Sequence, residues 1–419
     1  MNIRKYRHYL GNAYRNILKW FVGVIPKDNN LILFSAWFGK KYSDNSKYLF
    51  EYMLSHSNYN VFWFTKDYTI YTSLKEKKIP CVYSKTIKAK WYQCRAKMLV
   101  ATVQTSDFNT LLLNKCIYLD LDHAFPGKPV ALAQPEVNDA WVEWYHFCKK
   151  GLDFYQTASS RFVVELFGPW YDVQPDHFIF CNKPRIDVLC NKELQKGINL
   201  KVDELAQGRR ILSYLPTHRS CGRKKMNIQE ILDLSQIQKI CEASGSVFLI
   251  KKHFYHRNEK ENLLNYPNIF DITNDDIDTQ VLLAKTDVLI TDFSSCFNDF
   301  LALDRPIVFY AYDYDDYFKN DRDYFWKYDV VTGGYTEKTK IGLTNALLSL
   351  AKDWTDRAHA EGRQEMRRVY FDEDVEIGNS CEKLCSIITQ LIDGVYVPFN
   401  WDSKERPSIL DVLHIAKAK

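Results

Sequence analysis

The sequence predicts an α/β protein of two Rossmann-like, doubly wound domains that face a cleft. Short apolar runs alternate with helical stretches along most of the chain. A polar stretch at residues 190–209 interrupts this alternation once, and the pattern then starts again. Strands that alternate with helices form a parallel sheet with helices on both faces. A chain of 419 residues is long for one domain and suits two.

The first half contains five apolar runs of strand length. We expect strands at 31–35, 60–64, 80–83, 97–101 and 116–121. Helices are expected at 45–56, 86–95, 138–149 and 159–167. The first domain is therefore assigned to residues 29–200.

The second half repeats the pattern after the polar stretch, which we interpret as the linker. Strands are expected at 210–215, 246–251, 268–272, 286–290 and 306–310. Helices are expected at 227–243, 277–285 and 295–303. The second domain is assigned to residues 201–395, followed by a tail at 396–419.

Composition restricts the kind of partner and the compartment. The formal net charge is only +4, so nucleic acid is not an expected partner, and any preference for anions must come from local clusters. The eleven cysteines are scattered without a CxxC or zinc-type spacing, and we expect neither a metal nor a cofactor. No cleavable signal or apolar run long enough to span a bilayer is apparent. These features favour a cytoplasmic location with reduced thiols.

Residues 1–28 form a separate segment that is both basic and aromatic. One helical face is apolar and carries Ile3, Tyr6, Leu10, Tyr14, Ile17 and Phe21. The basic residues, mostly on the other face, are Arg4, Lys5, Arg7, Arg15 and Lys19. Such a helix suits the headgroup layer of an anionic membrane. The alternative is that the apolar face packs on the protein; the one-sided charge favours the membrane surface.

Polar side chains follow three expected strands of the second half. They belong to residues 216–219 (PTHR), 251–253 (KKH) and 291–295 (TDFSS). Ligands of open α/β sheets bind outside the carboxyl ends of the strands. These three strand ends therefore predict a binding site.

The 291–295 turn leads from a strand into a helix. Ser294 or Ser295 is expected to cap that helix, whose first N–H groups and dipole favour an anion such as phosphate. Arg219 suits bidentate contact with a diphosphate, or else a surface salt bridge. His253 is a candidate phosphate ligand or proton carrier, or else a structural histidine.

The first half has one comparable strand end. His123 follows the 116–121 strand, beside Asp120 and Asp122 and before a Pro-Gly turn. A neighbouring carboxylate can orient an imidazole, which suits a general base. The alternative is a loop histidine beside solvated carboxylates. A metal site is disfavoured because residues along a strand alternate faces.

These segments resemble the CDP-glycerol glycerophosphotransferases, the family of teichoic-acid primases and polymerases and related capsule enzymes. The similarity covers nearly all of residues 31–395. Residues 42–49 (YSDNSKYL) resemble the family's "YSDNPKYLY", and residues 183–189 (KPRIDVL) resemble its "G-x-PRND-x-L". PTHR resembles "PTWR". Residues 291–300 (TDFSSCFNDF) resemble "TDYSSVFFDF", and the similarity continues through residues 304–307 and 312–315.

The resemblance implies a GT-B fold with an N-terminal acceptor domain and a C-terminal CDP-donor domain. By position, His123 matches the histidine of "WHGTPLK" and His253 that of "KxHP", so both are expected to be catalytic. The candidate substrate-binding residues are Arg185, Asp187, Thr217, Arg219, Lys251, Thr291, Asp292, Ser294, Ser295 and Asp299. The departures from the pattern lie at residues 122–128 (DHAFPGK), 253–254 (HF), 322–325 (RDYF) and 332–334 (TGG).

The implied reaction is attack of an acceptor hydroxyl on the β-phosphorus of CDP-glycerol or a related CDP-polyol, with release of CMP. The acceptor is a lipid-linked or polymeric cell-surface glycan, and the enzyme is peripheral at the inner face of the cell membrane. His123 is expected to act as the base, while His253, Arg219 and the 294–295 turn stabilise the diphosphate. A sugar-nucleotide glycosyltransferase of the same fold and a non-catalytic membrane-bound assembly scaffold are the alternatives. The sequence leaves the polyol and the acceptor open.

Overall fold

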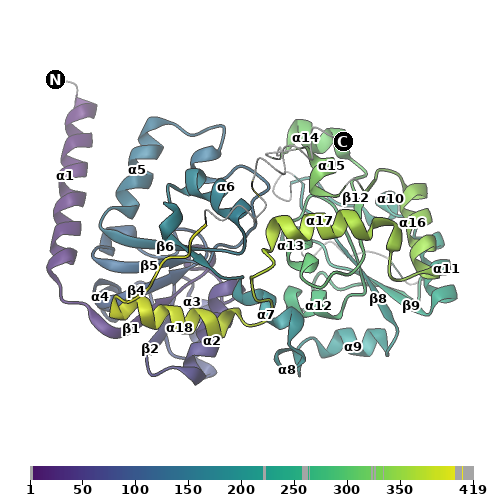
Figure 1. The fold of residues 1–419 in the computed structure, drawn as a ribbon, viewed down its shortest axis with the longest axis horizontal. Coiled ribbons are helices and arrows are strands. Elements are labelled where there is room, and N and C mark those ends of the chain that lie inside the picture. The colour runs from purple at the N-terminus through teal and green to yellow at the C-terminus, as the bar shows by residue number, and fades with distance from the viewer. Residues whose placement is uncertain are drawn as a thin grey trace. The chain divides into compact units, whose positions relative to one another are not determined.

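The computed structural model describes residues 3–219, 223–256, 263, 265–321, 324, 327–333, 335–401 and 408, with the backbone alone at 3–12 and 254. The chain divides into two compact units. The first holds the chain up to Ala124, then Val130–Arg185 and the segment that starts at Asn379. The second holds Phe125–Pro129 and Ile186–Gly378. Both units are parallel α/β structures, which confirms the predicted fold class (Figure 1).

The first unit contains a seven-stranded parallel sheet in the order β3-β2-β1-β4-β5-β6-β7. Its strands are β1 (Asp28–Phe34), β2 (Asn60–Thr65), β3 (Cys81–Tyr83), β4 (Ala96–Ala101), β5 (Cys116–Asp120), β6 (Leu152–Ala158) and β7 (Phe178–Phe180). Its helices are α1 (Ile3–Val24), α2 (Asp44–His56), α3 (Tyr68–Glu76), α4 (Ile87–Arg95), α5 (Asp139–Lys149), α6 (Arg161–Tyr171) and α18 (Ser380–Asp393). Helix α7 (Pro184–Cys190) begins in this unit and continues into the second.

The second unit contains a six-stranded parallel sheet in the order β10-β9-β8-β11-β12-β13. Its strands are β8 (Arg210–Leu215), β9 (Ser246–Ile250), β10 (Ile269–Asp271), β11 (Val288–Thr291), β12 (Ile307–Tyr310) and β13 (Thr336–Glu337). Its helices are α8 (Lys192–Gln195), α9 (Leu200–Ala206), α10 (Ile228–Ile231), α11 (Leu234–Ser244), α12 (Thr279–Lys285), α13 (Cys296–Leu301), α14 (Tyr314–Asn320), α15 (Tyr328–Val331), α16 (Lys340–Lys352) and α17 (Ala360–Tyr370).

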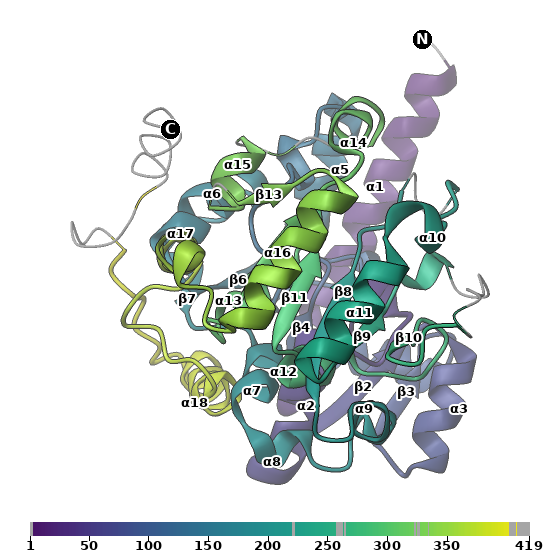
Figure 2. The same ribbon diagram turned by 90° about the vertical axis from the view of Figure 1, so that its right-hand side faces the viewer.

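Each sheet is apolar on both faces, and one face of each carries a large core cluster. In the second sheet, alternate residues such as Leu212, Phe248 and Val308 pack against α11 and α16, which lie side by side on that face (Figure 2). In the first sheet, Ile32 and Trp63 face the cluster that α2 and α18 complete.

Helix α18 belongs to the first unit although it lies at the far end of the chain. Its apolar stripe, which includes Leu384 and Ile388, packs beside α2 in the first core (Figure 1). We had assigned the whole of 201–395 to the second domain. The structure differs because the apolar stripe of α18 is buried in the first core, beside α2.

The polar stretch at 190–209 was also interpreted wrongly as a linker. It forms α8 and α9, and Val202 and Ala206, four residues apart, are buried in the second unit, which begins at Ile186. The expected helix 227–243 is two helices, because Asp233 accepts the N–H of Gln236 and starts α11. Strands β6, β7 and β13 and helices α3, α7 and α14–α18 were not predicted. Most of the predicted tail, residues 402–407 and 409–419, lies outside the described residues.

Both sheets place their first and fourth strands side by side. The chain winds outward from β1 and β4 in the first sheet and from β8 and β11 in the second. The carboxyl ends of such a strand pair form the crevice in which doubly wound sheets bind their ligands. The relevant side chains are therefore those that follow these strands.

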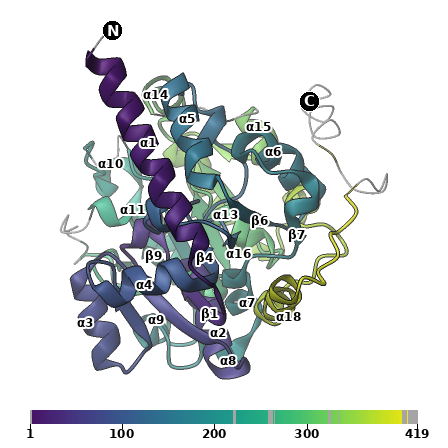
Figure 3. The same cartoon turned by 90° about the vertical axis from the view of Figure 1, so that its left-hand side faces the viewer.

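Helix α1 docks on the first unit through a narrow face that contains Lys19 and Val22 (Figure 3). Lys19 Nζ donates to the carbonyl oxygens of Phe147, Cys148 and Lys150 at 2.6, 3.1 and 2.9 Å, at the end of α5. On the predicted apolar face Tyr14, Ile17 and Phe21 are exposed, so the alternative in which this face packs on the protein is wrong for these residues. The side chains of Ile3, Tyr6 and Leu10 lie outside the described part.

Candidate functional site

His123 lies at the switch point of the first sheet. Its ring centroid is 5.0 Å from that of Trp37, which follows β1. Its Nδ1 lies 3.1 Å from the carbonyl oxygen of Thr102, which follows β4. Sequence reasoning placed His123 at a strand end but missed Trp37 and Thr102, which the same strand-end rule would have found after β1 and β4.

The contact with Thr102 assigns the tautomer of His123. A carbonyl oxygen can only accept, so Nδ1 carries the hydrogen, and in the neutral ring the lone pair is then on Nε2. The His123 side chain is about one third exposed, at 32%. The ring is therefore held by the backbone at Nδ1 and is partly exposed to solvent.

Two buried aspartates support the His123 loop. Asp122 Oδ1 accepts the backbone N–H groups of His123 and Ala124 and lies 3.3 Å from His123 Nδ1. Asp122 has φ +50, a left-handed conformation that aspartate tolerates better than most residues. Asp120 accepts a hydrogen bond from Gln104. Burial, and then the charge of Asp122, raise the pKa of Asp120 well above its usual value.

Arg185 is buried and holds the His123 loop from the opposite side. Its Nη1 donates to the carbonyl oxygen of His123 at 2.6 Å and to Asp44 Oδ1 at 2.8 Å. Asp44 Oδ2 accepts the indole N–H of Trp37 at 2.9 Å. Arg185 was predicted to bind substrate; its described contacts instead position Trp37 and His123.

At the second switch point, Arg219 joins three strand ends. Its guanidinium donates to Asp292 Oδ2 at 2.8 Å, to both oxygens of Asp313 at 2.7 and 2.8 Å, and to the carbonyl oxygen of Thr217 at 2.7 Å. Asp292 Oδ1 also accepts the N–H of Thr217. Arg219 is only 2% exposed, so its ion pairs are buried rather than the surface salt bridge of the alternative, and its donors are occupied by Asp292, Asp313 and Thr217. Asp313, which follows β12, was not predicted.

The 291–295 turn contains both buried and accessible groups. Thr291 is buried and donates to the carbonyl oxygen of Leu215 at 2.7 Å. Ser294 Oγ accepts the N–H of Cys296 at 3.4 Å. Ser295 is exposed and makes no side-chain cap bond to α13. Ser295 is therefore the accessible residue of this turn.

Aromatic rings surround His253 at the end of β9. Its ring centroid lies 4.7 Å from His218 and 4.8 Å from Tyr255, and Tyr255 is 49% exposed. The neighbouring Lys251 is half-buried. The structure thus brings the ends of β8 and β9 together, with His253 at the surface of the cluster.

Asp187 and Asp299 are buried in helices rather than in the loops that follow the strands. Asp187 lies in α7 and is 3% exposed. Asp299 lies in α13, is 2% exposed and accepts a hydrogen bond from Gln280 at 3.0 Å. Both aspartates are expected to stabilise the fold.

Residues 125–129 follow the His123 loop and pack within the second unit. Lys128 Nζ donates to the carbonyl oxygen of Phe293 at 2.8 Å and to the hydroxyl of Tyr317 at 2.7 Å. The hydroxyl of Tyr324 donates to the same carbonyl oxygen. Of the altered motifs, Arg322, Asp323, Phe325 and Gly334 lie outside the described residues.

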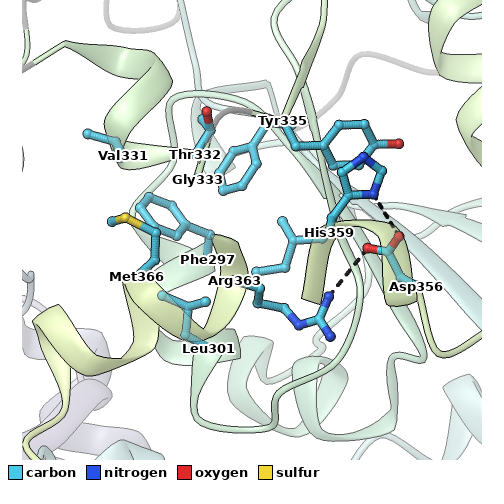
Figure 4. Close-up of a pocket in the computed structure, with 12 residues that line it drawn as sticks. Phe297, Leu301, Val331, Thr332, Gly333, Tyr335, Asp356, His359, Arg363 and Met366 are labelled. Atoms are coloured by element: carbon cyan, nitrogen blue, oxygen red, sulfur yellow. Dashed lines mark hydrogen bonds and ion pairs between the residues drawn. The ribbon is translucent and has the colours of Figure 1, made fainter. Parts of the chain in front are cut away.

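One pocket of the second unit lies away from the strand ends, among α13, β12 and α17 (Figure 4). Its polar wall contains Asp356, which pairs with His359 at 2.7 Å and with Arg363 at 3.3 Å. None of the predicted site residues lines it. Within the described part of the chain, no cluster of three or more potential metal ligands was found.

Comparison with known proteins identifies the class. The profile of the family "CDP-Glycerol:Poly(glycerophosphate) glycerophosphotransferase" matches residues 17–390. The chain belongs to this family, which confirms the resemblance deduced from its motifs. It is an enzyme that transfers glycerol phosphate from a CDP-linked donor to a polymer.

Individual relatives are teichoic acid enzymes, two of them named for glycerol phosphate and one for ribitol phosphate. The chain is 27% identical over 361 residues to a teichoic acid poly(glycerol phosphate) polymerase of Bacillus spizizenii, covering 82% of this chain and 89% of the relative. It is 25% identical over 384 residues to a teichoic acid glycerol-phosphate transferase of Staphylococcus aureus, covering 86% of this chain and 93% of the relative. A teichoic acid ribitol-phosphate polymerase of the same organism is 24% identical over 369 residues, covering 81% of this chain and 66% of the relative.

Solved structures support the fold. The wall teichoic acid polymerase TagF superposes with a TM-score of 0.70 at 22% identity, covering 94% of this chain and 99% of that chain. A TagF variant soaked with CDPG gives 0.72 at 21% identity over the same shares. This similarity confirms a GT-B-like fold. In the described part of the chain, no helix combines the length and apolar character needed to span a bilayer.

Proposed function

We propose that His123 is the general base of glycerol phosphate transfer. Its Nε2 takes the proton of the acceptor hydroxyl while that oxygen attacks the β-phosphorus of CDP-glycerol. The bond between the β-phosphorus and the bridging oxygen breaks, and CMP leaves. The observation that carries this proposal is the contact between His123 Nδ1 and the carbonyl oxygen of Thr102, which leaves Nε2 as the acceptor.

We propose that the second unit binds the donor at the ends of β8, β9 and β11. His253, Lys251 and Ser295 are at least partly accessible there and suit contact with the diphosphate. Arg219 and Asp292 act through position: their buried ion pair fixes the loops that present these groups. Phosphoryl transfer depends mainly on positioning and charge stabilisation, which such a rigid set of strand ends supplies.

The donor is tested by incubating the protein with CDP-glycerol, CDP-ribitol and sugar nucleotides, together with a lipid-linked glycerol phosphate acceptor. We expect CMP release and an acceptor mass increase of one glycerol phosphate per transfer. If the acceptor gains mass only with CDP-ribitol, the transferred group is ribitol phosphate rather than glycerol phosphate. Release of UDP or GDP from a sugar nucleotide, or no turnover with any donor, would contradict the proposal.

We further propose that α1 holds the enzyme at the inner face of an anionic membrane, beside a lipid-linked acceptor. Tyr14, Ile17, Trp20, Phe21 and Val24 are each more than half exposed. Such an aromatic and aliphatic stripe suits the headgroup boundary. Arg15 and Lys19, two of the expected basic residues, contribute less than predicted, because Arg15 lies over Trp144 and Lys19 is buried against α5.

A further inference from the structure

A second pocket lies in the first unit, at the carboxyl ends of β2 and β3. It is lined by Phe64, Lys66, Ser84, Lys90, Gln93, Phe108, Asn109, Thr110 and Leu112. These lining residues include two lysines and several hydroxyl and amide groups, but no acidic residue. A pocket of this composition suits an anion that is held by hydrogen bonds and positive charge.

The two lysines differ in how they are held. Lys66 follows β2 directly, and its Nζ donates to the carbonyl oxygens of Ser106 and Phe108 at 2.8 and 3.1 Å. An ammonium group has three hydrogens, so Lys66 keeps one for a ligand while its position is fixed. Lys90 is exposed on α4, and no described residue forms a hydrogen bond or ion pair with its ammonium group.

Hydrogen bonds also fix the loop residue Asn109, next to Phe108. Gln93 is 1% exposed, and its side-chain amide bonds both backbone groups of Asn109, at 2.6 and 3.1 Å. Asn109 Oδ1 in turn accepts the N–H of Leu111 in the 3-10 turn η2 (Thr110–Leu112). Burial lowers the pKa of Lys66. A bound anion would offset part of that burial cost.

The loop that lines this pocket also touches His123. Thr102 contacts His123 Nδ1 at one end of the loop, and Phe108 and Asn109 line the pocket at the other. Asp107 ties the loop together by accepting the N–H of Thr102. Three strand spacings separate β2 from β5 in the sheet order, or roughly 14 Å along the same carboxyl edge.

We infer that this pocket is a subsite for a phosphodiester of the polymeric acceptor, upstream of the unit whose hydroxyl His123 deprotonates. The inference rests on the proposed function. Poly(glycerol phosphate) carries one negative charge per unit, so a growing chain along this edge presents an anion to Lys66 and Lys90. A very short acceptor would not reach the pocket, and a neutral acceptor would present no anion to it.

The test compares Lys66→Gln and Lys90→Gln with the unchanged protein, using lipid-linked acceptors with a single glycerol phosphate unit or with a long glycerol phosphate chain. We expect each substitution to raise KM for the long acceptor about tenfold, the loss expected for one charge-assisted hydrogen bond. KM for the short acceptor and for CDP-glycerol should stay the same. Lys88→Gln is the matched control, because Lys88 is also exposed on α4 but lies outside the pocket.

Different failures have different outcomes. If the unchanged protein releases no CMP from CDP-glycerol with either acceptor, the proposed function is wrong. If it is active and both variants keep their KM for the long acceptor, the subsite is wrong. Lys66→Gln also removes the hydrogen bonds to Ser106 and Phe108 and so can disturb the loop. If Lys66→Gln lowers turnover with both acceptors, the subsite is judged from Lys90→Gln alone.

Discussion

The Nδ1 atom of His123 lies 3.1 Å from the carbonyl oxygen of Thr102. This contact joins the end of β5 to the loop after β4 and holds the ring at Nδ1. Trp37 restricts the ring from the β1 side. The fold thus sets the ring's direction and tautomer before a substrate binds.

Replacement of His123 tests its assignment as the base. We expect His123→Ala to lower kcat by about 10²- to 10⁴-fold, the usual contribution of general acid–base catalysis. Affinity for CDP-glycerol, measured by calorimetry, should remain unchanged, because the proposed donor contacts lie in the second unit. Full activity of the variant would refute the assignment.

Asp122 is expected to act as a positioning residue. Asp122→Asn keeps an oxygen acceptor and tolerates the left-handed backbone, so we expect a fall in kcat of about tenfold or less with KM unchanged. Asp122→Ala removes the acceptor for the N–H groups of His123 and Ala124 and should lower kcat further. Equal kcat values for both variants and the unchanged protein would show that the carboxylate has no part in orienting His123.

Arg219 is expected to stabilise the fold rather than bind the donor. Arg219→Ala leaves the buried Asp292 without its cation, and we expect the free energy of unfolding to fall by about 3–5 kcal/mol. Arg357→Ala, at an exposed pair 3.7 Å from Asp353, is the control and should change it by less than about 0.5 kcal/mol. A donor-binding role predicts the reverse result: unchanged denaturation and a raised KM for CDP-glycerol.

The buried Lys149 should make the free energy of unfolding depend on pH in the alkaline range. Burial lowers its pKa from 10.5 to about 8, against the opposing effects of Asp120 and Asp172. Between pH 8 and 10.5 the unfolded chain binds the proton that the folded protein has released, so this contribution to stability rises with pH. Relative to Lys149→Met, the free energy of unfolding should rise by up to about 3 kcal/mol across this window. A difference in free energy of unfolding between the unchanged protein and Lys149→Met that stays the same from pH 8 to 10.5 would contradict the prediction.

The exposed stripe of α1 predicts binding to lipid vesicles. Trp20→Ser and Phe21→Ser should each weaken binding to anionic vesicles about tenfold, since burial of a large apolar side chain is worth about 1.5–3 kcal/mol. The melting temperature should not change, because both side chains are exposed. Tyr68→Ser, at an exposed tyrosine of α3, is the control. If the α1 substitutions leave vesicle binding unchanged, this helix is not the membrane contact.

The sequence alone determined the architecture and the strand ends. Strand-length apolar runs give β1–β5 and β8–β12, because a parallel sheet with both faces covered requires apolar residues on every strand. The motif at 291–300 indicated the family, because many positions match in one contiguous segment. His123 was found because a polar, ionisable residue directly after a buried strand has little structural use in a core.

Only the tertiary structure decided what several of these residues do. Arg219 was predicted to bind the donor phosphate, but Asp313, 94 residues further along the chain, lies beside it in a buried ion pair. Arg185 likewise turns inward to Asp44, 141 residues away. Helix α18 joined the first core for the same reason. Sequence patterns report local periodicity and strand ends, whereas burial and ion pairing depend on contacts between distant segments, which no local pattern specifies.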